Sequence, residues 1–213
     1  MSYLPQQFSQ QLLPGGWIDG AAHLASPNFD TRPEGCRPDL LVIHAISLPL
    51  GQFSNAEPTG SSPLYIEDLF LNRLDTTAHP DFAQLEGVRV SAHFLILRDG
   101  SLVQFVGADQ RAWHAGVSVF EDRSACNDFS IGIELEGSDF VPFEPAQYDT
   151  LVELTQRLVQ HYPIRHVVGH KDIAPARKTD PGPFFDWTLY QKLTLQRFPL
   201  VLANAAIRGQ SVR

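Results

Sequence analysis

The chain of 213 residues is 43% hydrophobic and 19% charged. This composition predicts one folded domain with a sizeable core, and it excludes two large domains or a disordered chain. The formal net charge of −8 argues against a nonspecific grip on nucleic acid or on an anionic membrane surface. An anionic substrate must therefore meet a local cluster of basic side chains.

Other sequence features indicate the compartment. The N-terminus lacks a basic segment followed by an apolar stretch, and no run of about 18 apolar residues occurs, so we expect neither a cleavable signal nor a membrane anchor. Two cysteines, Cys36 and Cys126, are too few for a disulfide framework and suit a reducing compartment, although one bridge is also compatible with the sequence. These features favour a cytoplasmic protein. Nothing in the sequence specifies an oligomeric state.

The predicted elements begin after an arm rich in proline and glycine. We expect residues 1–38 to be irregular and packed on the core, residues 39–198 to form the main domain, and residues 199–213 to form a tail. The apolar run over residues 39–46 predicts a strand buried on both faces, with His44 near its end. Residues 47–63 form a long loop, which is either a functional flap or a plain surface insertion. Helical spacing of apolar residues then predicts a short helix within residues 64–74.

A hairpin follows, because Asp99-Gly100 separates two β-type runs at 90–97 and 101–106. Residues 129–136 alternate between apolar and polar side chains, which places Glu134 on a polar sheet face. Pro145 begins the clearest amphipathic helix, which extends to about Tyr162. A strand at 164–168, a loop at 171–183 and a helix at 186–198 complete the series. The pattern predicts an α/β (α+β) fold, with a central mixed sheet flanked by helices.

Histidine and acidic residues stand out near the ends of these strands, whereas the common nucleotide-binding and serine-hydrolase signatures are missing. His44, His170 and Asp180 would supply two imidazoles and one carboxylate for zinc, leaving a fourth position for water. A single histidine at the end of a strand is more often an ordinary buried side chain, and the spacing is weak support by itself. Three further histidines compete for the ligand positions on sequence grounds: His93, His114 and His166.

Six segments, in order, resemble the AmpD-type N-acetylmuramoyl-L-alanine amidases of peptidoglycan recycling. They are residues 41–44, 89–93, 111–116, 126–137, 169–170 and 174–183, and the likeness covers roughly residues 14–193. The long match over 126–137 is far more specific than any single histidine. The resemblance implies a zinc amidase fold shared with phage amidase lysozymes and peptidoglycan recognition proteins, with the metal in a groove on one sheet face.

The resemblance also implies roles for particular residues. The zinc ligands fall on His44, His170 and Asp180, the catalytic glutamate on Glu134 and the catalytic lysine on Lys178. Glu134 would move a proton from water to the departing amine, and Lys178 would stabilise the developing oxyanion. Without the resemblance, the favoured interpretations are that Glu134 is a solvent-facing strand residue and that Lys178 is half of a solvated basic pair with its neighbour.

Substrate contacts are expected from four residues. Arg89 and Arg123 are candidates for binding stem-peptide carboxylates, and Trp113 and His114 for lining the groove, although an aromatic core residue and a buried histidine are the competing interpretations. Two departures from the family affect the outer rim of the groove. Asp81 stands where a tyrosine is expected, and the loop from Leu48 to Pro63 is longer than in relatives.

We therefore expect a cytoplasmic zinc amidase that cleaves the bond between the lactyl group of N-acetylmuramic acid and L-alanine. The expected substrate is a 1,6-anhydromuropeptide from wall turnover, a preference that rests on the resemblance alone. One alternative is a phage-type endolysin that acts on intact peptidoglycan. Another is a binding module that holds peptidoglycan fragments without cutting them.

Overall fold

The computed structural model describes residues 12–53, 65–197 and 206–207. Its centre is a seven-stranded sheet in the order β13-β12-β5-β11-β6-β7-β3. These strands are Ala206–Ile207, His166–Gly169, Leu40–Ile46, Ser130–Glu136, Phe94–Ile96, Leu102–Gln104 and Ala22–His23, respectively. The pairs from β13 to β6 are parallel, β6 and β7 are antiparallel, and β3 joins β7 in parallel. The mixed sheet and the hairpin of the sequence prediction are confirmed.

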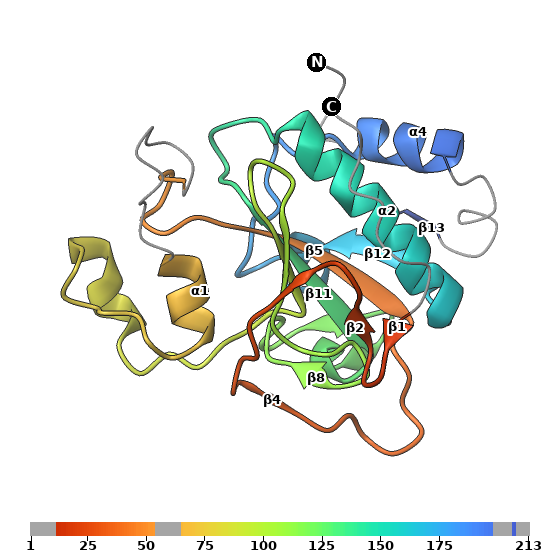
Figure 1. Cartoon of the computed structure of the whole chain (residues 1–213), viewed down its shortest axis with the longest axis horizontal. Helices are drawn as coiled ribbons and strands as arrows, with labels where there is room; N and C mark the ends of the chain where they lie inside the picture. The colour runs from red at the N-terminus through yellow and green to blue at the C-terminus, as the bar shows by residue number, and fades with distance from the viewer. Residues whose placement is uncertain (1–11, 54–64, 198–205, 208–213) are drawn as a thin grey trace.

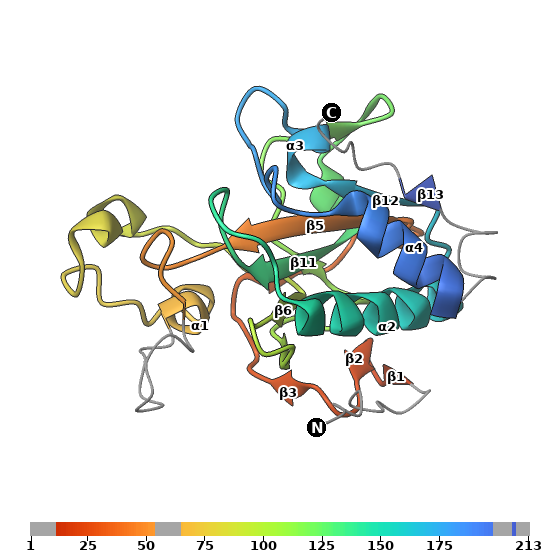
Figure 2. The same cartoon turned by 90° about the horizontal axis from the view of Figure 1, so that it is seen from above.

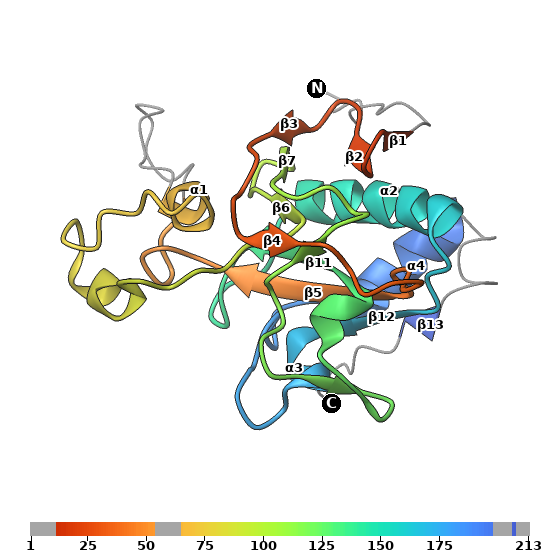
Figure 3. The ribbon, with the colours of Figure 1, turned by 90° about the horizontal axis from the view of Figure 1, so that it is seen from below.

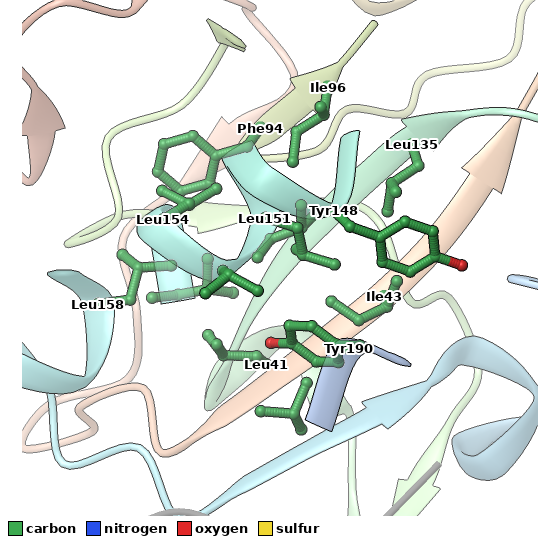
Figure 4. Close-up of a cluster of buried hydrophobic side chains, with 14 of the residues drawn as sticks. Leu41, Ile43, Phe94, Ile96, Leu135, Tyr148, Leu151, Leu154, Leu158 and Tyr190 are labelled. Carbon is green, nitrogen blue, oxygen red and sulfur yellow. The ribbon is translucent and has the colours of Figure 1, made fainter. Parts of the chain in front are cut away.

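Two helices cover one face of this sheet. Figure 1 shows α2 (Pro145–His161) and α4 (Trp187–Arg197) lying above the central strands. The apolar side chains of β5 and β11 alternate, so Leu41 and Ile43 point into this layer with Leu135, where they meet Leu151 of α2 and Tyr190 of α4 (Figure 4). Burial of this apolar surface supplies the main stabilisation of the domain.

Shorter elements cover the opposite face. They include α3 (His170–Ile173), the 3₁₀ helix Cys126–Asp128, β8 (Arg111–Ala112) and the hairpin of β9 (Val119–Phe120) and β10 (Arg123–Ser124). Figure 3 shows α3 and the green hairpin below β5. Leu40 and Val42 of β5 pack there against Phe129 and Val168. Because both faces are covered, all seven residues of β11 are buried, Glu134 among them. The alternation is confirmed, but the face that carries Glu134 is not open to solvent.

The N-terminal arm contains more regular structure than the sequence indicated. β1 (Leu12–Leu13) pairs with β2 (Trp17–Ile18), and β4 (Phe29–Asp30) pairs with β8, while β3 extends the sheet edge. Strands of two residues leave no periodicity in a sequence rich in proline and glycine, so they could not be predicted. In the same way, β13 lies within the expected tail, whose other residues lie outside the described part of the chain.

A lobe with two short helices lies beside the carboxyl ends of β5 and β11 (Figure 2). It contains α1 (Tyr65–Phe70) and the 3₁₀ helix Pro80–Leu85. The helix expected over 64–74 ends early, because Asn72 has a positive φ of 58° and the amides of Arg73 and Leu74 both bond to the Asp68 carbonyl. Residues 54–64 of the long loop lie outside the described residues. Within the described ranges, none of the helices combines the length and apolar character needed to cross a membrane.

Candidate metal centre and catalytic groove

The parallel strands bring the candidate ligands to one edge of the sheet. In the pairing of β5 with β11, His44 lies directly opposite Glu134. In the pairing of β5 with β12, Ile43 lies opposite Gly169, so that His170 follows at the next position, where α3 begins. The imidazoles of His44 and His170 and the carboxylate of Glu134 therefore meet at the carboxyl ends of three adjacent strands, β5, β12 and β11.

Three of the predicted side chains converge on one point. Nδ1 of His44 and Nδ1 of His170 are 2.9 Å apart, and Oδ2 of Asp180 is 3.2 Å from the first and 3.1 Å from the second. A tetrahedron with metal–ligand bonds of about 2.0–2.1 Å has edges of about 3.3 Å, so the three atoms are spaced like three of its corners. Nitrogen and carboxylate oxygen are donors that zinc accepts. The residues present therefore fit a zinc ion, and the structure brings the three residues predicted as ligands together.

The loop that carries Asp180 is held at both ends. The carbonyl of Asp180 accepts a hydrogen bond from the amide of Lys171 at 2.9 Å. Thr179 donates from Oγ1 to Oδ2 of Asp139 at 2.7 Å. Gly182 has a φ of +83°, and a Cβ there would lie 2.1 Å from Oδ1 of Asp139, so only glycine allows this close approach. These contacts fix the carboxylate relative to α3.

Burial sets the charge state of the first imidazole. His44 is only 1% exposed, and desolvation lowers its pKa to about 4, against the opposing effect of the hydrogen bond with Asp180. The imidazole is therefore neutral at pH 7, as a metal ligand must be.

Glu134 lies beside the converging atoms. Its Oε1 is 4.0 Å from Nδ1 of His44, and within the described residues its buried Oε2 has no hydrogen-bond partner. Burial, with a further contribution from the charge of Asp180, raises the pKa of Glu134 well above its usual value, while Lys178 opposes this shift. A buried carboxyl group with an unpaired oxygen is able to accept and release a proton, which is the property of a general base.

A groove of about 190 Å³ opens over these residues. Trp113, His114 and Lys178 line it together with the converging side chains, as the sequence prediction requires of groove residues. Its other lining residues are Ala45, Ile46, Phe70, Val90 and Ser91. An aromatic wall, a lysine and a buried carboxylate therefore face the same small space.

The two predicted arginines do not line this groove within the described part of the chain. Arg89 is exposed, next to the groove residue Val90. Arg123 donates to both carboxylate oxygens of Asp39, at 3.0 and 3.1 Å, and its guanidinium stacks 3.8 Å from the ring centre of Phe129. Asp81 is also exposed and is not one of the groove residues of the described chain.

Sequence reasoning missed several residues that support the site. Arg177 is exposed, but its Nη2 donates to the carbonyls of Ala115 and Val117 at 2.8 and 2.9 Å. Gly132 lies beneath the ring of His114, where a Cβ would approach the ring to 2.4 Å. A glycine inside a strand is a known sign of such an approach, so this position could have been found. The contacts of Arg177 with backbone carbonyls leave no sequence signal.

Two imidazoles and a carboxylate next to a second, unpaired carboxylate form the kind of site found in metal-dependent hydrolases. The sequence model of the N-acetylmuramoyl-L-alanine amidase family matches residues 34–183. The chain belongs to this family and is an amidase.

Named relatives agree with this assignment. The chain is 50% identical to the 1,6-anhydro-N-acetylmuramyl-L-alanine amidase AmpD of Enterobacter cloacae over 184 residues, 85% of this chain and 94% of the relative. It is also 50% identical to AmpD of Escherichia coli, over 85% and 96% of the two chains. A crystal structure of AmpD superposes with a TM-score of 0.78 at 49% identity, covering 86% of this chain and 99% of the other.

A more distant structure holds a ligand. It is the amidase AmiD from Escherichia coli in complex with the substrate anhydro-N-acetylmuramic acid-L-Ala-D-γ-Glu-L-Lys. It is 31% identical, with a TM-score of 0.52, and the match covers 76% of this chain and 60% of AmiD.

Proposed function

We propose that this chain is a zinc-dependent amidase that hydrolyses the amide between the lactyl group of 1,6-anhydro-N-acetylmuramic acid and L-alanine. The observation that carries the proposal is the convergence of His44, His170 and Asp180 within 3.2 Å of one another, beside Glu134. The substrate class is supported by two relatives that are 50% identical and whose names give this substrate. The match covers 94% and 96% of their lengths. The anhydromuropeptide in the AmiD complex is consistent with the same substrate.

The chemistry divides among the groove residues. Zinc, when bound by His44, His170 and Asp180, supplies polarisation of the scissile carbonyl and increases the acidity of water. Glu134 accepts the proton of the attacking water on its unpaired Oε2 and passes it to the departing amine of L-alanine. Lys178 provides positive charge for the oxyanion from the rigid loop that also carries Asp180.

The remaining groove positions serve the substrate. Trp113 offers a flat wall for the sugar or peptide, and its backbone amide is fixed by a 3.1 Å hydrogen bond to Oγ of Ser91. Arg89, exposed beside the groove, is the better placed of the two arginines to bind a stem-peptide carboxylate. His114 contacts the candidate ligand His44, with its Nδ1 2.9 Å from Nε2 of that residue.

We also propose that the enzyme acts in the cytoplasm, on muropeptides recovered during peptidoglycan recycling. The two cysteines support this compartment, because the thiols of Cys36 and Cys126 are both free, as a reducing environment favours.

The test is turnover of a purified anhydromuropeptide, with and without a chelator, together with metal analysis. Asp180→Ala should lose zinc, whereas Glu134→Gln should retain zinc and lose at least about 100-fold in kcat. Lys178→Met should lower kcat by about 100- to 1,000-fold, whereas Lys192→Met, at an exposed position of α4 that is not among the groove residues, serves as the matched control. Full activity in Glu134→Gln would contradict its role as the proton carrier.

The same assay separates the alternatives. Faster release of peptide from intact sacculi than from anhydromuropeptides would indicate an endolysin. Binding of muropeptides by the zinc-loaded chain without any turnover would indicate a recognition module.

A further inference from the structure

The outer nitrogens of both ligand histidines meet one short segment of the chain. Nε2 of His44 is 2.9 Å from Nδ1 of His114, and Nε2 of His170 is 3.2 Å from the carbonyl oxygen of Ala115. Two adjacent residues, at positions 114 and 115, therefore contact the sides of the imidazoles that face away from the converging donor atoms.

The second of these contacts fixes a proton. A carbonyl oxygen can only accept a hydrogen bond, so Nε2 of His170 must carry the hydrogen that is donated to Ala115. A neutral imidazole has one N–H, and Nδ1 of His170 is therefore left with a lone pair. That lone pair points to where Nδ1 of His44 and Oδ2 of Asp180 converge.

The first contact is fixed through a longer chain of hydrogen bonds. Oγ of Ser130 lies 2.6 Å from the carbonyl oxygen of Cys126, so the single hydroxyl proton must lie between these two oxygens. Ser130 Oγ is also 3.0 Å from Nε2 of His114, and with its proton used it can only accept there. Nε2 of His114 is then the donor, and Nδ1 of His114 accepts from Nε2 of His44.

The opposite assignment conflicts with metal binding. If His114 carried a hydrogen on Nδ1, Nε2 of His44 would have to accept it. The one hydrogen of a neutral His44 would then lie on Nδ1 and point at His170, so that no lone pair would remain for the metal. Only one direction of the hydrogen-bond chain gives both ligands the required tautomer.

The surrounding chain holds the segment in place. Oδ1 of Asn127 accepts from the amides of His114 and Ala115 at 3.2 and 2.8 Å. The Ala115 carbonyl also accepts from Nη2 of Arg177 at 2.8 Å. Gly132 leaves room for the His114 ring, as described above. The position of the His114 ring above Gly132 is therefore fixed, and each ring nitrogen has one hydrogen-bond partner.

We propose that the segment 114–115 is the positioning element of the metal centre, which sets the tautomer and orientation of both ligand histidines before the metal arrives. His114 is in this view a positioning residue that acts through His44, in addition to lining the groove. The inference rests on the proposed zinc site. It predicts that metal affinity depends on an acceptor at Nδ1 of His114.

The experiment measures the zinc dissociation constant of full-length variants by competition with a chromophoric chelator. His114→Leu removes the acceptor and should weaken zinc binding by about 10- to 100-fold. His114→Asn places Oδ1 close to the position of Nδ1, and it should remain within about threefold of the unmodified protein. His93→Asn is the matched control, because His93 is buried nearby, with its ring centre 5.7 Å from that of His114, but its Nδ1 accepts from the amide of Gly132 and does not contact His44.

Two results of the affinity measurement would overturn the inference. One is unchanged zinc affinity in His114→Leu, and the other is an equal loss in His114→Asn, which would show that the bulk of the ring and not its acceptor matters. A second measurement needs no variant: ¹⁵N spectra of the imidazoles in the zinc-loaded protein should show His114 protonated at Nε2. Protonation at Nδ1 refutes the hydrogen-bond chain whether or not His114→Leu folds. If the unmodified protein does not bind zinc, the proposed function fails instead, so the two failures are distinguishable.

Discussion

Gly132→Ala tests the site without removing any polar group. A Cβ at position 132 would lie 2.4 Å from Cγ of His114 and 2.5 Å from its Nδ1, whereas ordinary contact begins at 3.4 Å. The ring must therefore retreat by about 1 Å, the kind of strain that costs a packed interior about 1–3 kcal/mol. The 2.9 Å hydrogen bond between His114 and His44 then lengthens beyond hydrogen-bond range.

The expected result is a loss of zinc affinity of about 10- to 100-fold, and a fall in kcat/KM of about 100-fold at saturating zinc, because a displacement near 1 Å misplaces the reacting groups. Gly137→Ala is a matched control. Its Cβ would lie 2.3 Å from Cε1 of Phe143, a similar clash with an aromatic ring, but in the core under α2. Chelator competition and urea unfolding of both metal-free variants are the assays. Equal zinc affinities in the two variants, with similar losses of stability, would refute the reasoning.

Three other predictions follow from particular side chains. Burial raises the pKa of Glu67, so its charge destabilises the fold above the ordinary carboxyl pKa; Glu67→Gln should raise the urea midpoint at pH 7, and the gain should disappear as the pH falls below about 4.5. Asp39 is bound by two arginines, and Asp39→Ala should cost about 1–3 kcal/mol in urea unfolding without changing KM. Arg89→Ala should raise KM for a muropeptide about tenfold, whereas Arg123→Ala should leave KM unchanged and lower stability; the reverse pattern in steady-state kinetics would assign the carboxylate to Arg123.

Local patterns were sufficient where one segment determines its own structure. Pro145 and the apolar spacing after it predicted α2, which spans Pro145–His161, because a fixed φ at the first turn and a continuous apolar stripe need no distant partner. The turn at Asp99-Gly100 was equally clear, since Gly100 adopts a φ of +86° that glycine readily supplies. The amide of Leu189 bonds to Oδ1 of Asp186 at 2.8 Å, as expected of the residue that caps α4.

Long-range arrangement was beyond local patterns. The side-by-side position of His44 and Glu134 depends on the parallel register of β5 and β11, which is set by packing between segments about 90 residues apart and not by either strand alone. Spacing alone could not choose the candidate ligands among the competing histidines, and the candidate roles of Glu134 and Lys178 came only from resemblance to a family. The same limit explains Arg123, whose partner Asp39 is 84 residues away in the sequence. A charge alone does not reveal whether it is already paired.

The parallel register of β5 and β12, which places His170 beside His44, would tie metal supply to the survival of the folded enzyme. In an unfolded chain the proposed donors are separated by 126 and 10 positions, so tight binding of zinc would require that the strands have already paired in register. A ligand that binds only the native state, at a free concentration 100 times its dissociation constant, adds about 2.7 kcal/mol to the free energy of unfolding. Removal of zinc should therefore abolish activity and also increase the rate at which proteases degrade the protein.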